Sequence, residues 1–195
     1  MKNIIKTFIL LVALSSCSNL KSKYPVVEIE TKFGNVYIEI YNDKAPKTAA
    51  AFLKNVEAGH YENSNFYRVL SQDNQSSDAV KNFLIQGGLW RNAGKLSETL
   101  PRIPHESTQQ SGILHTDGVI SMARLETGSA SAEFFICVGN QPGLNYGGKN
   151  NPDGQGYAAF GKVIEGMDIV QKIYRQPEDD QYFDPPVPIY KITLQ

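Results

Sequence analysis

One arginine stands out among the residues that could do chemistry, because it interrupts an otherwise apolar stretch. Arg68 lies between Tyr67 and Val69 in the segment FYRVL, residues 66–70. Arginine stays charged at physiological pH, and its planar guanidinium presents N–H donors in a rigid fork. A cation held in this way can stabilise a lone pair or a negative charge that develops during a reaction. The plain alternative is a structural arginine that faces outward from a strand.

The other residue types that commonly carry catalysis show no comparable placement. The three histidines, His60, His105 and His115, have no partner at metal-ligand spacing, and the chain contains no G-x-S-x-G or H-E-x-x-H motif. Nothing points to a Ser/His/acid triad, so covalent catalysis is the less favoured class. We expect no metal and no cofactor. The formal net charge of −1 gives no sign of a basic face, which argues against nucleic-acid binding.

Arg68 belongs to a pair of short strand candidates that flank a long polar run. FYRVL and NFLIQGG (82–88) are apolar, and residues 71–82 between them have no strand or helix period, which predicts a loop. Alternating apolar and polar residues predict a hairpin of strands 26–30 and 35–40. Further strand candidates lie at 118–123, 157–163 and 189–194.

Two helices are expected among these strands. The first opens at residues 43–46, with Asp43 or Thr48 as N-cap and Pro46 in the first turn, and closes at Gly59. The second spans 166–174. Residues 89–114 contain prolines and a glycine that break periodicity, which predicts an irregular segment. Seven or eight short strands with two helices favour a closed antiparallel barrel, although the pattern alone does not choose barrel over sandwich.

The N-terminus has the pattern of a targeting segment. Two lysines precede an apolar stretch, residues 8–14, that is too short to span a bilayer as a helix. It ends in LSSC (14–17), which resembles the bacterial lipobox, in which the cysteine is acylated. The resemblance implies a signal peptide (1–16), a lipidated Cys17 followed by a tether to residue 24, and a globular domain (25–195). It also implies that the lipid anchors the protein to the outer face of a bacterial membrane. An ordinary secretory signal is the alternative. Cys137, in an apolar run, is expected to be a buried thiol.

Six blocks of the chain resemble, in order, the cyclophilins, a family of peptidyl-prolyl cis/trans isomerases. In chain order the blocks are APKTAAAFL, FYRVL, FLIQGG, GVISMA, EFFI and YAAFGKVIEGMDIV. The resemblance covers roughly residues 26–194 and implies a mainly β fold, a closed eight-stranded antiparallel β-barrel capped by two helices. Tyr67 stands where the family usually has His, and the loop after FYRVL is longer by about ten residues.

The resemblance also assigns roles to residues. Arg68 matches the catalytic arginine, which would donate a hydrogen bond to the prolyl nitrogen as the amide twists over its barrier of about 18–20 kcal/mol. Phe83, Leu84, Phe135 and Leu144 match the proline pocket, and Tyr157 takes a substrate-binding position that bacterial members often fill with Tyr. The positions that contact the substrate backbone are Gln86, Ala123 and Arg124, with Arg124 replacing the usual Asn, and Glu133 stands where the family has Gln.

Three departures from the family concern the same region. If the side chains of Glu133 and Arg68 meet, their ion pair would compete with substrate for the guanidinium; near an exposed groove it would contribute roughly 0–1 kcal/mol, which predicts reduced rather than abolished activity. Gly143 replaces an aromatic residue of many members, so the pocket rim is expected to be thinner. The loop 71–82 either selects substrates or is a tolerated surface insertion.

The sequence as a whole predicts a lipid-anchored, monomeric isomerase that binds proline-containing polypeptides in the bacterial cell envelope. The alternative is a chaperone module that binds proline peptides with weak or no catalysis. Arg68 favours the enzyme, whereas Glu133 and the long loop favour the binding module. A third possibility is an unrelated lipid-tethered barrel with a structural Arg68.

Overall fold

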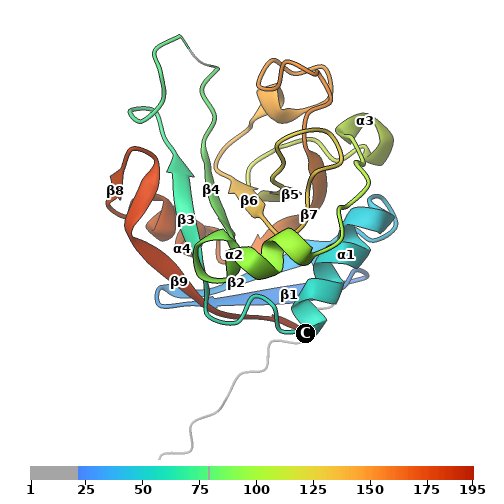
Figure 1. Cartoon of the computed structure of the whole chain (residues 1–195), viewed down its shortest axis with the longest axis vertical. Helices are drawn as coiled ribbons and strands as arrows, with labels where there is room; N and C mark the ends of the chain where they lie inside the picture. Colours follow the sequence, from blue (N-terminus) through green and yellow to red (C-terminus); the bar gives the residue numbers. More distant parts are fainter. Residues whose placement is uncertain (1–21, 79) are drawn as a thin grey trace, which may run out of the picture.

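The strands expected from the alternating pattern close into a ring. The computed structural model describes residues 22–78 and 80–195, and all strand pairs in it are antiparallel (Figure 1). In pairing order the ring consists of β1 (Val26–Thr31), β2 (Gly34–Ile40), β7 (Ala158–Glu165), β5 (Val119–Met122), β6 (Phe134–Cys137), β4 (Leu84–Gly88), β3 (Ser64–Leu70) and β9 (Tyr182–Leu194). Pairing of β9 with β1 closes it, so the eight-stranded barrel is confirmed. A two-residue strand, β8 (Glu178–Asp179), pairs only with β9.

The last strand is longer than predicted, because it starts at Tyr182 rather than at residue 189. Its first part pairs with β3, but the pairing passes from Val187 to Tyr182 and omits Pro185 and Pro186. Proline has no N–H to donate, so it is tolerated where a strand makes no regular ladder bonds. The second part, from Ile189 onward, pairs with β1.

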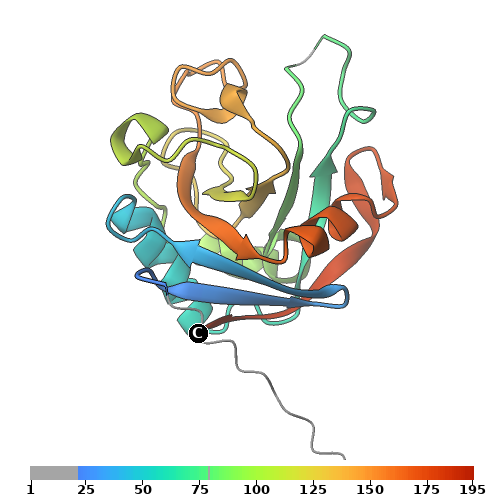
Figure 2. The ribbon, with the colours of Figure 1, turned by 180° about the vertical axis from the view of Figure 1, so that it is seen from behind.

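The two predicted helices are present as α1 (Pro46–Glu57) and α4 (Met167–Tyr174). The first packs against β7 and β9, and the second packs against β2 and β4. Figure 2 shows α4 beside the β1–β2 hairpin, on the face opposite to α2.

The predicted cap of α1 is wrong, because neither Asp43 nor Thr48 caps this helix. Its N-cap residue is Ala45, and the carboxylate of Glu106 accepts hydrogen bonds from the backbone N–H groups of Lys47 (3.1 Å) and Thr48 (2.7 Å). A carboxylate at a helix N-terminus satisfies exposed donors and complements the helix dipole. Glu106 is buried and comes from a distant part of the chain, so local sequence could not reveal it.

Residues 89–114 are more regular than predicted. They contain α2 (Trp90–Thr99), which is kinked at Ala93, and a short α3 (Thr108–Ser111). Leu96 on α2 packs against the barrel core, so tertiary contact stabilises a helix that its sequence supports weakly. The prolines act as expected, since residues 101–107 between the two helices have no regular secondary structure.

The alternation of side chains along the strands separates the core from a second cluster. On β6, Phe134 and Ile136 lie in the barrel core, whereas Phe135 and Cys137 join Leu84 and Leu144 in a smaller cluster. Successive residues of a strand point to opposite faces, which explains this division. Cys137 is buried as expected and has no disulfide within the described part of the chain.

Residues 1–21, with the predicted signal peptide and the predicted lipid site Cys17, lie outside the described residues. Within residues 22–78 and 80–195, no helix combines the length and the apolar character needed to cross a membrane.

Candidate active site

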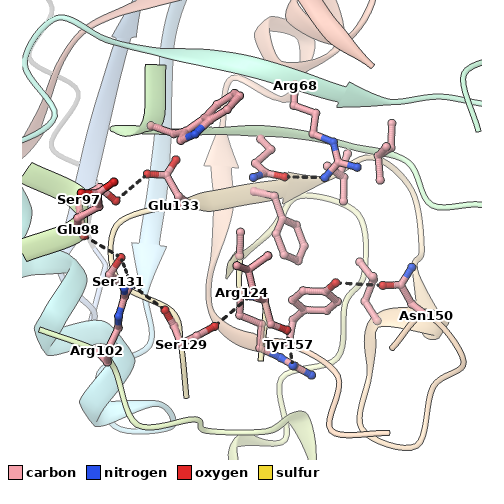
Figure 3. A pocket seen from close by; sticks show the side chains of 18 residues that line it. Arg68, Ser97, Glu98, Arg102, Arg124, Ser129, Ser131, Glu133, Asn150 and Tyr157 are labelled. Carbon is pink, nitrogen blue, oxygen red and sulfur yellow. Dashed lines mark hydrogen bonds between the residues drawn. The ribbon is translucent and has the colours of Figure 1, made fainter. Parts of the chain in front are cut away.

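A cavity of about 450 Å³ lies along β3, β4 and β6 on the outer side of the barrel (Figure 3). Its lining includes all but one of the positions predicted for catalysis or substrate binding: Arg68, Leu84, Gln86, Ala123, Arg124, Glu133, Phe135, Leu144 and Tyr157. Phe83 is not among the described residues that line it. Phe83 precedes β4, which begins at Leu84, the first residue of this segment to line the cavity.

A register shift in β3 directs Arg68 into this cavity. Phe66 pairs with Gly87 and Arg68 pairs with Gln86, so the strand gains one residue, Tyr67, relative to its partner. In a regular strand, residues 66 and 68 would point to the same face. The extra residue lets Phe66 remain in the core while Arg68 points outward, as β-bulges often do next to active sites.

The guanidinium of Arg68 is held by two glutamine side chains. Gln181 Oε1 accepts from Nε (3.2 Å) and from Nη2 (2.6 Å), and Gln86 Oε1 accepts from Nη1 (3.3 Å). Of the five N–H donors of arginine, these three bonds leave one on each terminal nitrogen. Gln86 was predicted to lie here, whereas Gln181 was missed. It follows Arg68 by 113 residues, and no motif marks it.

The side chains of Glu133 and Arg68 do not meet, so the ion pair considered from the sequence does not form among the described residues. The carboxylate of Glu133 accepts from Tyr67 Oη (2.8 Å), from the backbone N–H of Leu89 (3.0 Å) and from Ser97 Oγ (3.3 Å). Figure 3 shows Glu133 turned toward Ser97 while Arg68 extends the other way. Burial raises the pKa of this carboxyl above its ordinary value, against the hydrogen bonds, which lower it.

Glu133 instead sets the direction of a chain of hydrogen bonds that ends at Arg68. An ionised carboxylate only accepts, so Tyr67 Oη must donate to it. The Tyr67 oxygen then accepts from Gln86 Nε2 (2.7 Å), which leaves Gln86 Oε1 facing the guanidinium. The two departures from the family at residues 67 and 133 therefore form one contact, which orients Gln86.

The apolar part of the cavity consists of Leu84, Phe135 and Leu144, with Tyr157 standing edge-on to Phe135 at a ring separation of 5.4 Å. Behind Phe135 lies His115, whose ring nitrogens contact Asn145 Oδ1 (2.8 Å) and Ser121 Oγ (3.0 Å). Burial lowers the pKa of His115 to about 4, so the ring is neutral at physiological pH. His115 thus supports the pocket wall from behind.

The side chain of Arg124 is committed to the neighbouring loop. It is 1% exposed, its guanidinium pairs with both carboxylate oxygens of Asp153 (2.7 and 2.9 Å), and its Nε donates to the backbone carbonyl of Gly156 (2.8 Å). It also lies over the ring of Tyr157. The pairing with Arg124 holds the pKa of Asp153 well below its usual range. The side chain therefore fixes the pocket wall, and the backbone at Ala123 and Arg124 is the part that can face a peptide.

The described residues of the loop 71–82 (71–78 and 80–82) are held by hydrogen bonds from their own side chains and pack on the pocket rim. Gln75 bonds to the backbone of Ser71 and Asn82, and Asn74 Oδ1 accepts from the N–H of Ser71 (2.8 Å). A Cβ atom added at Gly143 would lie 3.1 Å from Val80 Cγ1. The rim beside Gly143 is therefore occupied by the loop, which the sequence did not indicate. Figure 1 shows the loop rising at the same end of the molecule as the turns around residues 142–156.

The cavity extends beyond the predicted residues toward α2. This second part is polar, and Figure 3 shows its side chains on the side away from Tyr157: Ser97, Glu98, Arg102, Ser129 and Ser131. Arg102 Nη1 donates to Ser131 Oγ (3.3 Å) and to the carbonyl of Ser129 (3.2 Å). The sequence did not indicate this part, because residues 89–114, where α2 lies, have the pattern of an irregular segment.

Comparison with known proteins agrees with this geometry. Residues 26–194 match the family model described as cyclophilin type peptidyl-prolyl cis-trans isomerase/CLD. The chain belongs to the cyclophilin family. It is 39% identical over 153 residues to a peptidyl-prolyl cis-trans isomerase of Acinetobacter baylyi, with 78% of this chain and 73% of the relative covered. It is 36% identical over 149 residues to peptidyl-prolyl cis-trans isomerase B of Escherichia coli, with 76% and 83% covered.

The fold is shared with solved cyclophilins as well. A cyclophilin type isomerase of Cryptosporidium parvum, whose structure was determined in the presence of the dipeptide Ala-Pro, has a TM-score of 0.66 and 22% identity. The match covers 87% of this chain and 98% of that one. This cyclophilin is thus an enzyme, a peptidyl-prolyl cis-trans isomerase.

Proposed function

We propose that Arg68 is the catalytic cation of this isomerase and that the cavity beside it binds the X-Pro segment. Arg68 carries the proposal, because its guanidinium is held in one orientation with two N–H donors left over. The apolar wall of Leu84, Phe135 and Leu144 suits a pyrrolidine ring. The substrate-contacting residues are those named from the sequence, without Phe83.

In this proposal catalysis needs no covalent step. As the X-Pro bond twists, its nitrogen loses conjugation and regains a lone pair. A donor that is already aimed at this lone pair stabilises the twisted state more than either planar state. Gln86 and Gln181 keep the guanidinium from moving with the substrate, so little reorganisation accompanies the twist.

The binding module without catalysis is less favoured than the sequence suggested. Its first argument was an ion pair that would occupy Arg68, and Glu133 is instead bonded to Tyr67, Leu89 and Ser97. The long loop remains compatible with either role.

The test is a coupled prolyl-isomerisation assay on residues 22–195, comparing wild type with Arg68→Ala, Arg68→Lys and Arg175→Ala. Arg175 is an exposed arginine at the end of α4 and serves as the matched control. We expect kcat/KM to fall at least about tenfold in Arg68→Ala. In Arg68→Lys it should recover only in part, because lysine keeps the positive charge but lacks the planar guanidinium with its fixed N–H donors. Equal activity of Arg68→Ala and Arg175→Ala would refute the assigned role.

We also propose that the protein is anchored by lipid on Cys17 at the outer face of a bacterial membrane, as a monomer, and isomerises X-Pro bonds of envelope proteins. The basic and apolar pattern of residues 2–14 and the LSSC sequence support this. The position of the start of the globular domain supports it too. The backbone carbonyl of Val26 accepts a hydrogen bond from the N–H of Gln195, and this pair lies at the end of the molecule opposite the loop 71–82 (Figure 1). A tether there would leave the cavity open to clients.

The anchor is tested with the full chain expressed in a bacterium that is fed a labelled fatty acid. We expect label and membrane association in wild type, loss of both in Cys17→Ser, and no effect in Cys137→Ser, whose thiol is buried. Unlabelled wild-type protein in the soluble fraction would refute the anchor. Light scattering of residues 22–195 gives the oligomeric state, and a dimer mass would refute the monomer.

A further inference from the structure

The turn between β8 and β9 has an unusual backbone. Asp180 and Gln181 have φ angles of 45° and 74°, in the left-handed region that favours glycine. Residues with a Cβ atom, such as glutamine, rarely adopt this region, and residues other than glycine that are held there often mark functional sites. The sequence at this turn therefore retains a side chain where glycine would fit the backbone better.

Every polar group of Gln181 has a partner. Its backbone carbonyl accepts from Val69 (2.8 Å), and its N–H donates to Glu178 Oε2 (2.8 Å). Its side-chain oxygen accepts two N–H groups of Arg68, and its Nε2 donates to the backbone carbonyl of Asn74 (2.9 Å) in the loop 71–82. A guanidinium only donates and a carbonyl only accepts, so the amide has a single orientation.

We propose that Gln181 is a positioning residue that holds the Arg68 guanidinium for catalysis and anchors it to the loop 71–82. The inference rests on the proposed role of Arg68. Gln181 supplies two of the three bonds to the guanidinium, and the shorter of them is 2.6 Å. Without it only Gln86 restrains this flexible side chain, and less of the arginine points at the substrate nitrogen when the amide twists.

Three variants separate the amide from the turn. Gln181→Met keeps side-chain length and removes the amide. Gln181→Gly removes the amide and suits the positive φ, so its melting temperature is expected to equal or exceed that of wild type. Asp180→Gly, the matched control, loosens the same turn and leaves Gln181 in place. We expect kcat to fall at least about tenfold in both Gln181 variants, because each loses two hydrogen bonds to a charged group, with KM changed less than about twofold.

Two further measurements complete the test. In the Arg68→Ala background Gln181→Met is expected to cause no additional loss of kcat, because the two residues act as a unit. In ¹H–¹⁵N spectra the Arg68 Nε–H signal is expected to be protected from exchange in wild type and in Asp180→Gly, and to lose protection in Gln181→Met. Wild-type kcat in Gln181→Met, or an equal loss in Asp180→Gly, would overturn the inference. Failure of the Arg68 assignment is distinct, because Arg68→Ala itself would then remain active.

Discussion

Replacing Glu133 with glutamine, the usual residue of the family at this position, is predicted to harm this protein rather than improve it. The buried carboxylate accepts from Tyr67 on one side and from Leu89 and Ser97 on the other. An amide has one accepting oxygen and one donating nitrogen, so it cannot accept on both sides. Glu133→Gln must therefore give up part of this network.

The two orientations of the new amide have different consequences. If the oxygen of the new amide accepts from Leu89, its nitrogen donates to Tyr67 Oη. The Tyr67 hydroxyl must then donate to Gln86, so the Gln86 amide turns over and presents its nitrogen, rather than its oxygen, to Arg68. With the oxygen of the new amide toward Tyr67, the N–H of Leu89 loses its acceptor. Either outcome costs about one hydrogen bond, roughly 1 kcal/mol, which is about a fivefold change in an equilibrium or a rate.

The assay measures kcat/KM from pH 5 to 8 together with the free energy of unfolding. At pH 8 we expect Glu133→Gln to lose about fivefold in kcat/KM or about 1 kcal/mol of stability, according to the orientation. Wild-type kcat/KM should rise with pH through the raised pKa of Glu133, because the protonated carboxyl can donate and no longer fixes the direction of the chain. The variant should lack this rise.

The stability of wild type carries the opposite pH dependence. Burial favours the protonated form, so the unfolded state releases this proton at a lower pH than the folded state. The contribution of Glu133 to stability is therefore full below the unfolded pKa and decreases as pH rises through the folded pKa. Glu98→Gln is the matched control, since Glu98 lines the same cavity. A gain in kcat/KM for Glu133→Gln would refute this reasoning, because it would indicate the ion pair with Arg68.

Two further predictions concern the walls of the cavity. Asp153→Asn should lower the melting temperature at pH 7 and raise KM, because Arg124 loses its ion pair. That ion pair depresses the pKa of Asp153, so the stability advantage of wild type over the variant should disappear as pH falls through the folded-state pKa. Unchanged KM in steady-state kinetics would contradict it. Gly88→Ala should lower the free energy of unfolding in urea by about 1–3 kcal/mol, because φ at this position is 142° and Glu133 occupies the space of the added methyl group. A free energy of unfolding equal to that of wild type would exclude this clash.

Much of the barrel follows from local patterns in the chain. The alternation in FFIC alone assigns Phe134 to one face and Phe135 to the other, and the structure places them in the core and in the cavity. Pro46 and Gly59 bracket α1 closely. Such features depend on neighbouring residues and on backbone preferences, so a single sequence contains them.

The sequence by itself determined the strand pattern, the family and the identity of most cavity residues, because these depend on residues close together in the chain. Tertiary structure alone decided which way Glu133 turns, that Glu106 caps α1, and that Gln181 reaches Arg68. It also decided the register shift that points Arg68 outward. These features arise when closure of the barrel brings together groups that are far apart in sequence, and buried polar groups then bond to whichever partners lie within reach.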